Sequence, residues 1–233
     1  MLTIQQILPG IRQLFYPHIC KGCGSDLIDD SQLICLRCMR ALPYTRFANQ
    51  PNNPIEKIFW GRLPVKAAHS EFYFSKDSLM QQLIHQLKYN QQQAIGLYLG
   101  QLMGTSLLHS SRFAEVEILV PLPLHPAKEK KRGYNQAAII AAGVASIMNL
   151  PVSKQNVIRK NATATQTKKH RIERWENVVD SFSVIRPQEL EGKGILLIDD
   201  VLTTGATMEA CGRAILNAAN CTLSMATLAI AEK

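Results

Sequence analysis

The sequence has few aromatic residues, fewer acids than bases and no long apolar run. Phe, Trp and Tyr together make up 6% of its 233 residues. No stretch approaches the roughly 18 consecutive apolar residues of a membrane-spanning helix, so we expect no membrane insertion. No low-complexity tract or internal repeat occurs. A hydrophobic content of 46% supports a real core, and the length suits one α/β domain plus a small module.

Two common phosphate-binding signatures are also missing. The chain contains neither the Gly-Lys-Ser/Thr of a Walker loop nor the G-x-G-x-x-G of a dinucleotide-binding loop. Residues 1–16 lack the basic start and long apolar run of a secretory signal. We therefore expect a cytoplasmic protein, and in that compartment its six cysteines are not expected to form disulfides.

The deficit of acids is local. Residues 121–176 hold 11 Lys and Arg against 3 acids, whereas the rest of the chain carries 15 of each sign, so this segment accounts for the whole net charge of +8. A solvated basic face is one interpretation. Because the excess lies near a candidate phosphate site, a polyanionic ligand or a nucleic acid is the other.

Four of the cysteines form two C-x-x-C pairs, Cys20 with Cys23 and Cys35 with Cys38. Four thiolates at this spacing are typical of a closed, tetrahedral structural zinc site with no open position for catalysis. His18 offers a substitute ligand, but four cysteines make it superfluous. We expect Cys211 and Cys221 to pack as small apolar residues.

The most informative stretch is residues 195–207, Ile-Leu-Leu-Ile-Asp-Asp-Val-Leu-Thr-Thr-Gly-Ala-Thr. Its apolar start predicts a parallel strand buried on both faces. Asp199 and Asp200 follow at the strand end, and residues 203–207 form a turn into a helix. Ligands of open α/β sheets bind at this edge, where the helix N-terminus presents free N–H groups. A phosphate on the turn and a diol on the two acids together indicate a ribose 5-phosphate.

The alternative is that the acids and threonines only cap the helix, because Asp and Thr are ordinary capping residues. One cap needs one such residue, however, and two adjacent carboxylates repel each other without a ligand or cation. We therefore favour the binding site.

Two further segments carry basic residues. After a strand over 116–124, the chain supplies His125, Lys128, Lys130, Lys131 and Arg132 before a helix capped by Asn135. This is where a parallel sheet would place a second anion site, although a solvated loop is the alternative.

Residues 159–184, between two expected strands, form a polar, basic segment that we interpret as a mobile hood over bound ligand. Its candidates for pyrophosphate or nucleic-acid contact are Lys168, Lys169, Arg171 and Arg174.

Strands alternating with helices predict an α/β domain with a mainly parallel sheet. We expect an amphipathic helix over 2–16, strands over 71–74, 116–124, 152–159, 178–184, 195–201 and 223–231, and further helices over 77–91, 94–109, 135–148 and 206–219. The expected domains are the helix and four-cysteine zinc module at 1–46, a linker with a short strand at 47–76, and the main domain at 77–233.

Taken together, these motifs resemble the ComF/ComFC family of competence proteins. The shared features are the paired C-x-x-C, Leu87-Lys88-Tyr89, Pro-Leu-His before Arg132-Gly-Tyr-Asn-Gln136, the Thr165-Gln-Thr segment, and the Asp-Asp-x-x-Thr-Thr-Gly-Ala-Thr string, in order along nearly the whole chain. Where many members have Leu and Ser or Asn, this chain has Lys169 and His170.

The resemblance implies a type I phosphoribosyltransferase-like domain, with a parallel sheet flanked by helices, joined to a small N-terminal zinc module with four cysteine ligands. It implies binding of phosphoribosyl pyrophosphate (PRPP) together with Mg²⁺. Asp199 and Asp200 would be the catalytic residues. The PRPP site would comprise these two acids, Val201, Leu202, Thr203, Thr204, Gly205, Ala206 and Thr207, together with Pro123, Leu124, His125 and Arg132.

The resemblance implies a role in DNA uptake during natural transformation. In that role the protein, together with a competence helicase, helps imported single-stranded DNA reach the cytoplasm. Two alternatives stay open: an active Mg²⁺-dependent phosphoribosyltransferase with an unidentified acceptor in nucleotide metabolism, and a non-catalytic DNA-binding adaptor. No segment identifies a particular acceptor, since a fold does not fix function.

Overall fold

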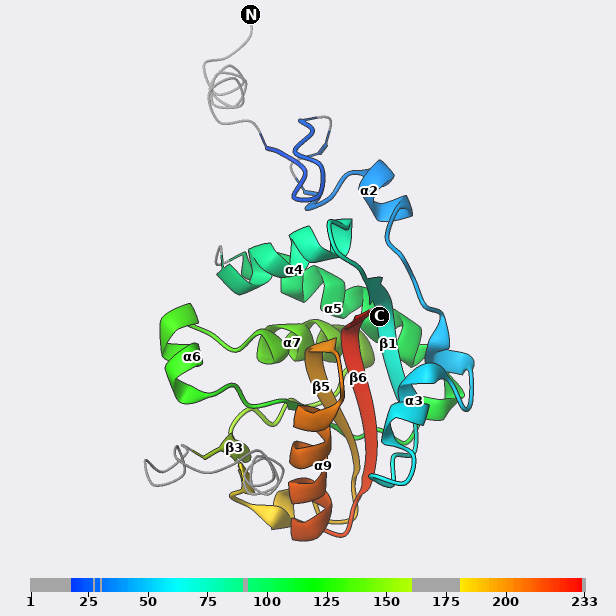
Figure 1. Ribbon diagram of the computed structural model, residues 1–233, viewed down its shortest axis with the longest axis vertical. Coiled ribbons are helices and arrows are strands. Elements are labelled where there is room, and N and C mark those ends of the chain that lie inside the picture. The colour runs from blue at the N-terminus through cyan, green and yellow to red at the C-terminus, as the bar shows by residue number, and fades with distance from the viewer. Residues whose placement is uncertain (1–17, 27, 30, 90–91, 161–180, 232–233) are drawn as a thin grey trace, which may run out of the picture.

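The computed structural model describes residues 18–26, 28–29, 31–89, 92–160 and 181–231. The expected helix over 2–16 therefore lies outside the described residues, as does most of the hood. In the part described, a four-stranded parallel sheet is covered by helices on both faces, which confirms the predicted fold class (Figure 1).

The strand order is β1-β6-β5-β2, and all three neighbouring pairs are parallel. The central strand β5 is buried over its first five residues, as expected of a strand with both faces covered. The strands of this sheet are β1 Ala68–Phe74, β2 Ile118–Pro121, β5 Gly194–Leu202 and β6 Thr222–Ala231.

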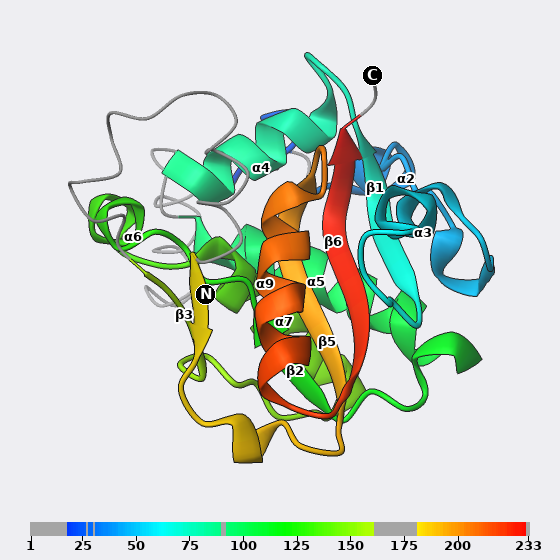
Figure 2. The same cartoon turned by 60° about the horizontal axis from the view of Figure 1, so that its bottom comes forward.

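Helices α4, α5 and α7 pack on one face of the sheet and α9 on the other, as Figure 2 shows. The shorter α3 lies beside β1, and α2 belongs to the cysteine-rich segment. Their bounds are α2 Leu36–Arg40, α3 Pro54–Phe59, α4 Leu79–Tyr89, α5 Gln93–Leu108, α6 Pro126–Arg132, α7 Gln136–Met148 and α9 Ala206–Ala218.

The closest packing between helices joins α5 and α7. A Cβ atom at Gly100 would lie 2.3 Å from the carbonyl oxygen of Ile140, and one at Gly143 would lie 2.2 Å from that of Leu97. The glycine-bearing face of α5 therefore permits backbone-to-backbone contact, and Gly143 supplies the matching surface on α7.

Two expected strands do not join the main sheet. β3 (Val157–Arg159) and β4 (Phe182–Val184) pair with each other in an antiparallel ribbon beside α9. The prediction that the strand over 152–159 is continuous was wrong: Val152 makes only an isolated bridge to Leu119. The four polar residues 153–156 separate that bridge from β3.

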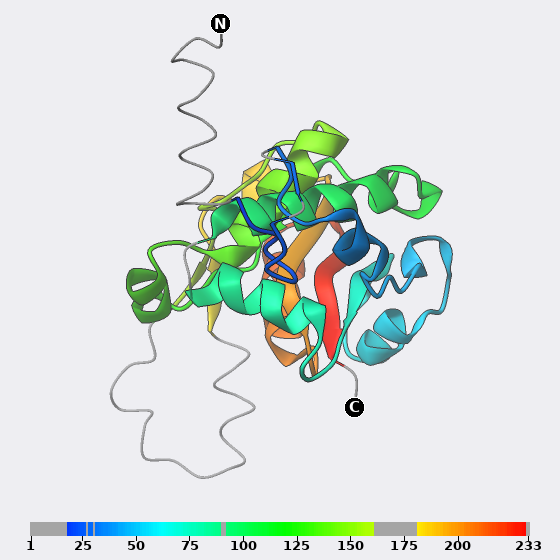
Figure 3. The ribbon, with the colours of Figure 1, turned by 90° about the horizontal axis from the view of Figure 1, so that it is seen from above.

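The cysteine-rich segment packs on α4, and Figures 1 and 3 both show it beside that helix. The Gln86 side chain donates a hydrogen bond of 2.7 Å to the Lys21 carbonyl oxygen. Cys20, Ile34 and Cys38 belong to the same buried cluster as α4 and α5. The segment is thus continuous with the core on this face of the sheet.

Candidate functional site

The two acids lie at an open notch in the sheet. β2 ends at Pro121, which pairs with Ile198, whereas β5 continues along β6 as far as Leu202. Asp199 is therefore the first residue of β5 beyond the end of β2. Because parallel strands end at the same edge, the segment after β2 and the turn after β5 leave the sheet together, as predicted.

Asp199 and Asp200 have different surroundings, since successive side chains of a strand point to opposite faces. Asp200 makes a 2.8 Å ion pair with the Lys88 ammonium group, on the face covered by α4. Asp199 senses the charge of Arg159 on β3 and lies near Cys211 on α9. The carboxylates also accept hydrogen bonds from the next backbone N–H groups, Asp199 from Asp200 at 2.8 Å and Asp200 from Val201 at 2.7 Å.

Asp199 has a raised pKa of about 8. Burial is the largest cause, and the negative charge of Asp200 adds to it. The N–H of Asp200 and the cations Lys88 and Arg159 act in the opposite direction. The notch therefore disfavours two negative charges and would accommodate them better with a bound cation or a hydroxyl donor.

The acids do not cap the following helix. The N-cap of α9 is Gly205, which is left-handed with φ +78°, and the side chain that accepts a hydrogen bond from the first helical residue is Thr204, whose Oγ1 atom lies 3.4 Å from the Ala206 nitrogen. The capping interpretation of Asp199 and Asp200 is therefore wrong. Thr203 and Thr204 are exposed, so the turn presents hydroxyls and the N-terminus of a 13-residue helix at the surface.

Gly205 is required by space as well as by conformation. A Cβ atom there would lie 2.8 Å from the Ile58 Cγ2 atom and 3.1 Å from the Phe59 ring. Helix α3 therefore supports the turn from beneath. Only glycine combines the positive φ with this close approach.

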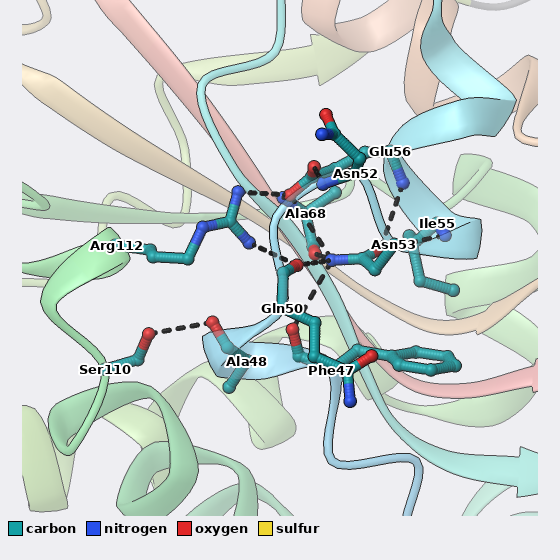
Figure 4. A network of polar contacts seen from close by, with 10 residues as sticks. All are labelled: Phe47, Ala48, Gln50, Asn52, Asn53, Ile55, Glu56, Ala68, Ser110 and Arg112. Carbon is teal, nitrogen blue, oxygen red and sulfur yellow. Dashed lines mark hydrogen bonds and ion pairs between the residues drawn. The ribbon is translucent and has the colours of Figure 1, made fainter.

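Helix α3 is itself fixed by a buried polar network, which Figure 4 shows. The Asn53 side chain accepts hydrogen bonds from the N–H groups of Ile55 and Glu56, capping α3, and donates one of 2.9 Å to the Ala68 carbonyl oxygen. Arg112 bridges Glu56 and the Gln50 carbonyl oxygen. The network joins α3 to β1. It therefore fixes the position of α3, the helix that packs against the turn at Gly205.

Arg62 links the turn to α9. Its guanidinium donates a 3.1 Å hydrogen bond to the Thr204 carbonyl oxygen and forms an ion pair with Glu209 in the first turn of α9. No motif in the sequence pointed to Arg62, because it is 142 residues from Thr204. Lys88 was signalled only by the Leu87-Lys88-Tyr89 motif.

The segment after β2 forms a short helix, α6, where the sequence suggested a loop. His125 is its N-cap, and its Nδ1 atom accepts a 3.2 Å hydrogen bond from the Ala127 N–H. Pro123 and Leu124 line a cavity of about 450 Å³ between α6, the start of α7 and β3, together with Lys154 and Arg159.

Arg132, at the end of α6, donates a 2.7 Å hydrogen bond to the Gln136 side chain. Asn135 caps α7 as predicted, accepting from the Ala137 N–H at 3.0 Å. The hood candidates Lys168, Lys169, Arg171 and Arg174 lie outside the described residues.

The four cysteines come together. The Sγ atoms of Cys20, Cys23, Cys35 and Cys38 all lie within 4.8 Å of one another, and those of Cys23 and Cys35 are 3.7 Å apart. Two sulfurs on a tetrahedral zinc ion with bonds of about 2.3 Å would be about 3.8 Å apart. The cluster therefore fits a metal such as zinc.

The backbone around the cluster favours the thiolate of Cys20, whereas burial and the neighbouring sulfurs raise the pKa of Cys38. Burial raises the pKa of Cys20, but hydrogen bonds from the N–H groups of Cys23, Cys35 and Gly22 lower it to about 6. His18 takes no part and instead contacts the Gln32 carbonyl oxygen at 2.6 Å. Of the two isolated cysteines, Cys211 is fully buried as expected, and Cys221 is partly exposed.

Comparison with known proteins places this geometry in a class. Residues 134–233, which include β5, the turn and α9, match the family described as "Phosphoribosyl transferase domain". This part of the chain is therefore similar to a phosphoribosyl transferase domain, as the resemblance of its motifs implied.

The relatives point to one branch of that class. The chain is 26% identical to DNA utilization protein YhgH of Escherichia coli (strain K12), over 85% of this chain and 78% of that protein. It is 25% identical to competence protein F of Haemophilus influenzae, over 82% and 80%. To competence protein ComFC of Bacillus subtilis (strain 168) it is 37% identical, over 46% and 43%. The chain is a homologue of these proteins, which confirms the ComF/ComFC resemblance.

Among solved structures, a glutamine PRPP amidotransferase from B. subtilis, complexed with ADP and GMP, aligns with a TM-score of 0.45 and 15% identity. The alignment covers 62% of this chain and 30% of the amidotransferase chain. Within the described residues, no helix is long and apolar enough to cross a membrane.

Proposed function

We propose that the protein binds PRPP with Mg²⁺ at the notch beyond the end of β2 and acts in the uptake or handling of single-stranded DNA in the cytoplasm. The observation that carries the PRPP proposal is the placement of two acids directly before a glycine turn and the N-terminus of α9. The phosphoribosyl transferase domain match over these residues supports it.

In this proposal each part of the site holds one part of the ligand. The hydroxyls of Thr203, Thr204 and Thr207 and the N–H groups from Gly205 into α9 hold the 5-phosphate. Asp199 and Asp200 hold the ribose hydroxyls, directly or through the metal ion. The segment containing Pro123, Leu124, His125 and Arg132 faces the pyrophosphate.

Magnesium would be held by few protein carboxylates and several waters, and it would neutralise the pyrophosphate. The charge balance at the notch agrees with this role, since burial and Asp200 raise the pKa of Asp199 despite the nearby cations Lys88 and Arg159. Lys88 offsets Asp200 in the structure, and a ligand at Asp200 would share or replace that ion pair.

The DNA role is supported by the names of the relatives, two of which are competence proteins and one a DNA utilization protein. It is also supported by the basic excess in residues 121–176. A helicase partner, which the family resemblance implies, belongs to the same proposal.

Calorimetry with PRPP and Mg²⁺ tests the site. We expect saturable binding to the wild-type protein, and loss of at least about tenfold in affinity for the Asp200→Asn variant, because charged hydrogen bonds are among the stronger ones. Asp77→Asn, at an exposed carboxylate outside the proposed site, is the control. Equal affinity in all three proteins would place the site elsewhere.

A second candidate, an active phosphoribosyltransferase, is favoured by the domain match itself. Incubation of the protein with labelled PRPP, Mg²⁺ and a panel of nitrogenous bases, with release of pyrophosphate as the readout, separates the two. Acceptor-dependent release identifies an enzyme. Binding without release identifies a PRPP-binding protein.

A further inference from the structure

An aromatic ring stands exposed at the end of α4, next to the proposed ribose site. Tyr89 is the last residue of α4 and is 60% exposed. Its neighbour in sequence, Lys88, pairs with Asp200 in the notch. An exposed, flat ring beside a phosphate-binding edge is suited to stacking on a ligand base.

Two more groups extend this ring into a platform. The His85 ring, one turn earlier on α4, lies 4.7 Å from the Tyr89 ring between centroids, at 44°. The guanidinium carbon of Arg132 lies 5.4 Å from the centroid of the Tyr89 ring. We name the set of His85, Tyr89 and Arg132 the stacking platform.

The platform is held in place by contacts between α4 and the start of α7. The Tyr134 hydroxyl donates a hydrogen bond to the Leu87 carbonyl oxygen, two residues before Tyr89. Arg132 is oriented by the side chain of Gln136, which is 2% exposed. Figures 1 and 2 both show the end of α4 on the same side of the molecule as α6.

The charge beside the platform is positive. Lys128, Lys130 and Lys131 on α6 are all exposed, with Glu129 as the one acid of that helix. A chain of phosphates could therefore run along α6 while a base lies on the ring. Tyr89 and the three lysines are all exposed at the surface, which suits a polymer better than a free base.

We propose that the stacking platform binds an unpaired base of single-stranded DNA, with the backbone phosphates against α6. Aromatic rings and guanidinium planes stack on any base, so the contact adds affinity without sequence preference. This inference deepens the proposed DNA role and rests on it, and the platform shares Arg132 with the pyrophosphate side of the proposed PRPP site.

Fluorescence anisotropy of the full-length zinc-loaded protein can test the platform with two labelled probes of equal length, oligo(dT) and an abasic oligonucleotide. The variants are Tyr89→Leu, Tyr89→Phe, and Trp60→Leu as a control at another exposed aromatic, 57% exposed at the end of α3. We expect Tyr89→Leu to lose about 5- to 50-fold in affinity for oligo(dT) and little for the abasic probe.

Tyr89→Phe and Trp60→Leu should bind both probes as the wild type does. The salt dependence of Tyr89→Leu should match that of the wild type, because stacking removes no phosphate contact. Wild-type protein that binds the two probes equally, or a Tyr89→Leu variant with unchanged affinity for oligo(dT), would overturn the platform while leaving DNA binding intact. Wild-type protein that binds neither probe would overturn the proposed DNA role itself.

Discussion

Asp199 shows how a single residue can be unfavourable for folding and useful in a site. Its carboxyl group is partly buried beside Asp200, and the ammonium group of Lys88 is paired with that neighbour. The protein keeps an ionisable group where ionisation is costly. Such perturbed groups concentrate where ligands bind, and this agrees with the proposed role of the notch.

Replacing this carboxyl group by an amide should stabilise the protein in a pH-dependent way. The pKa of Asp199 is about 8 in the folded state against an ordinary 3.8, so the folded state holds a proton that the unfolded state releases. The contribution of Asp199 to stability is therefore lost progressively as pH rises from about 4 to about 8. We expect Asp199→Asn to exceed the wild type in free energy of unfolding by about 1–3 kcal/mol at pH 8.

Urea unfolding at pH 5, 6, 7 and 8 would measure this difference. The Asp77→Asn variant, at an exposed carboxyl group, should follow the wild-type curve at every pH. A difference between Asp199→Asn and wild type that does not grow with pH would contradict the raised pKa.

The cysteine cluster predicts about one tightly bound zinc ion per chain. Cys35→Ser should lose it, because the remaining three sulfurs leave the tetrahedral site open. Metal analysis of protein purified without added zinc measures the content, and Cys221→Ser, outside the cluster, is the matched control. Wild-type protein free of metal, with the four thiols of the cluster intact, would refute the zinc site.

At the scale of elements, the contact between α5 and α7 depends on glycine. A methyl group at Gly100 would meet the backbone carbonyl of Ile140, which cannot move without shifting α7. We expect Gly100→Ala to lower the free energy of unfolding by about 3 kcal/mol.

Gly96→Ala, on the same helix, is the informative comparison. Its added methyl would meet side-chain atoms, those of Leu87 at 2.7 Å and Ile139 at 3.0 Å, which shift more readily than a backbone carbonyl. Its cost should be offset in part by the higher helix propensity of alanine, about 1 kcal/mol. Thermal unfolding of both variants should rank Gly100→Ala well below Gly96→Ala, and the reverse order would mean that the helices separate easily.

The turn after β5 depends on α3 and α9 through Arg62. Arg62→Lys cannot hold both the Thr204 carbonyl oxygen and Glu209, so the turn should lose its fixed shape with little change in stability. We expect the affinity for PRPP to fall by about tenfold.

Arg213→Lys provides the control. Arg213 also contacts Glu209, at 3.0 Å, but its other hydrogen bond goes to the Arg62 carbonyl oxygen and not to the turn. Calorimetry of the two variants should separate support of the turn from loss of a surface ion pair. If both variants bind PRPP as the wild type does, Arg62 does not position the turn.

At the scale of the whole molecule, charge is distributed unevenly. The excess of positive charge lies in residues 121–176, in the C-terminal half of the chain, which also contains Asp199 and Asp200. A polyanion should therefore bind mainly through phosphate contacts. Affinity for single-stranded DNA should fall steeply as salt rises, because each phosphate contact releases counterions.

Neutralising Lys168, Lys169, Arg171 and Arg174 together should weaken DNA binding and flatten the dependence on salt. Anisotropy at several salt concentrations measures both quantities, and excess PRPP should compete if the two polyanions share this segment. If the quadruple variant has the same affinity for DNA as the wild type and the same dependence of affinity on salt, these residues do not contribute to DNA binding.

The sequence by itself determined those features that local patterns encode. The apolar run of β5 with its following acids, the Asn135 cap and the four cysteines were all predicted, because strand burial, capping and metal ligation depend on residue type and spacing. The start of β1 was missed because His69, Ser70 and Glu71 are polar yet buried.

Only the tertiary structure decided which distant residues meet. The support of Gly205 by α3, the link from Arg62 to Thr204, the pair of Lys88 with Asp200 and the place of Tyr89 beside Arg132 all join segments far apart in the chain. The tertiary structure likewise decided that β3 and β4 pair with each other and not with the main sheet. Strand pairing and side-chain contact between such segments depend on how the layers pack, and no local pattern in the sequence carries that information.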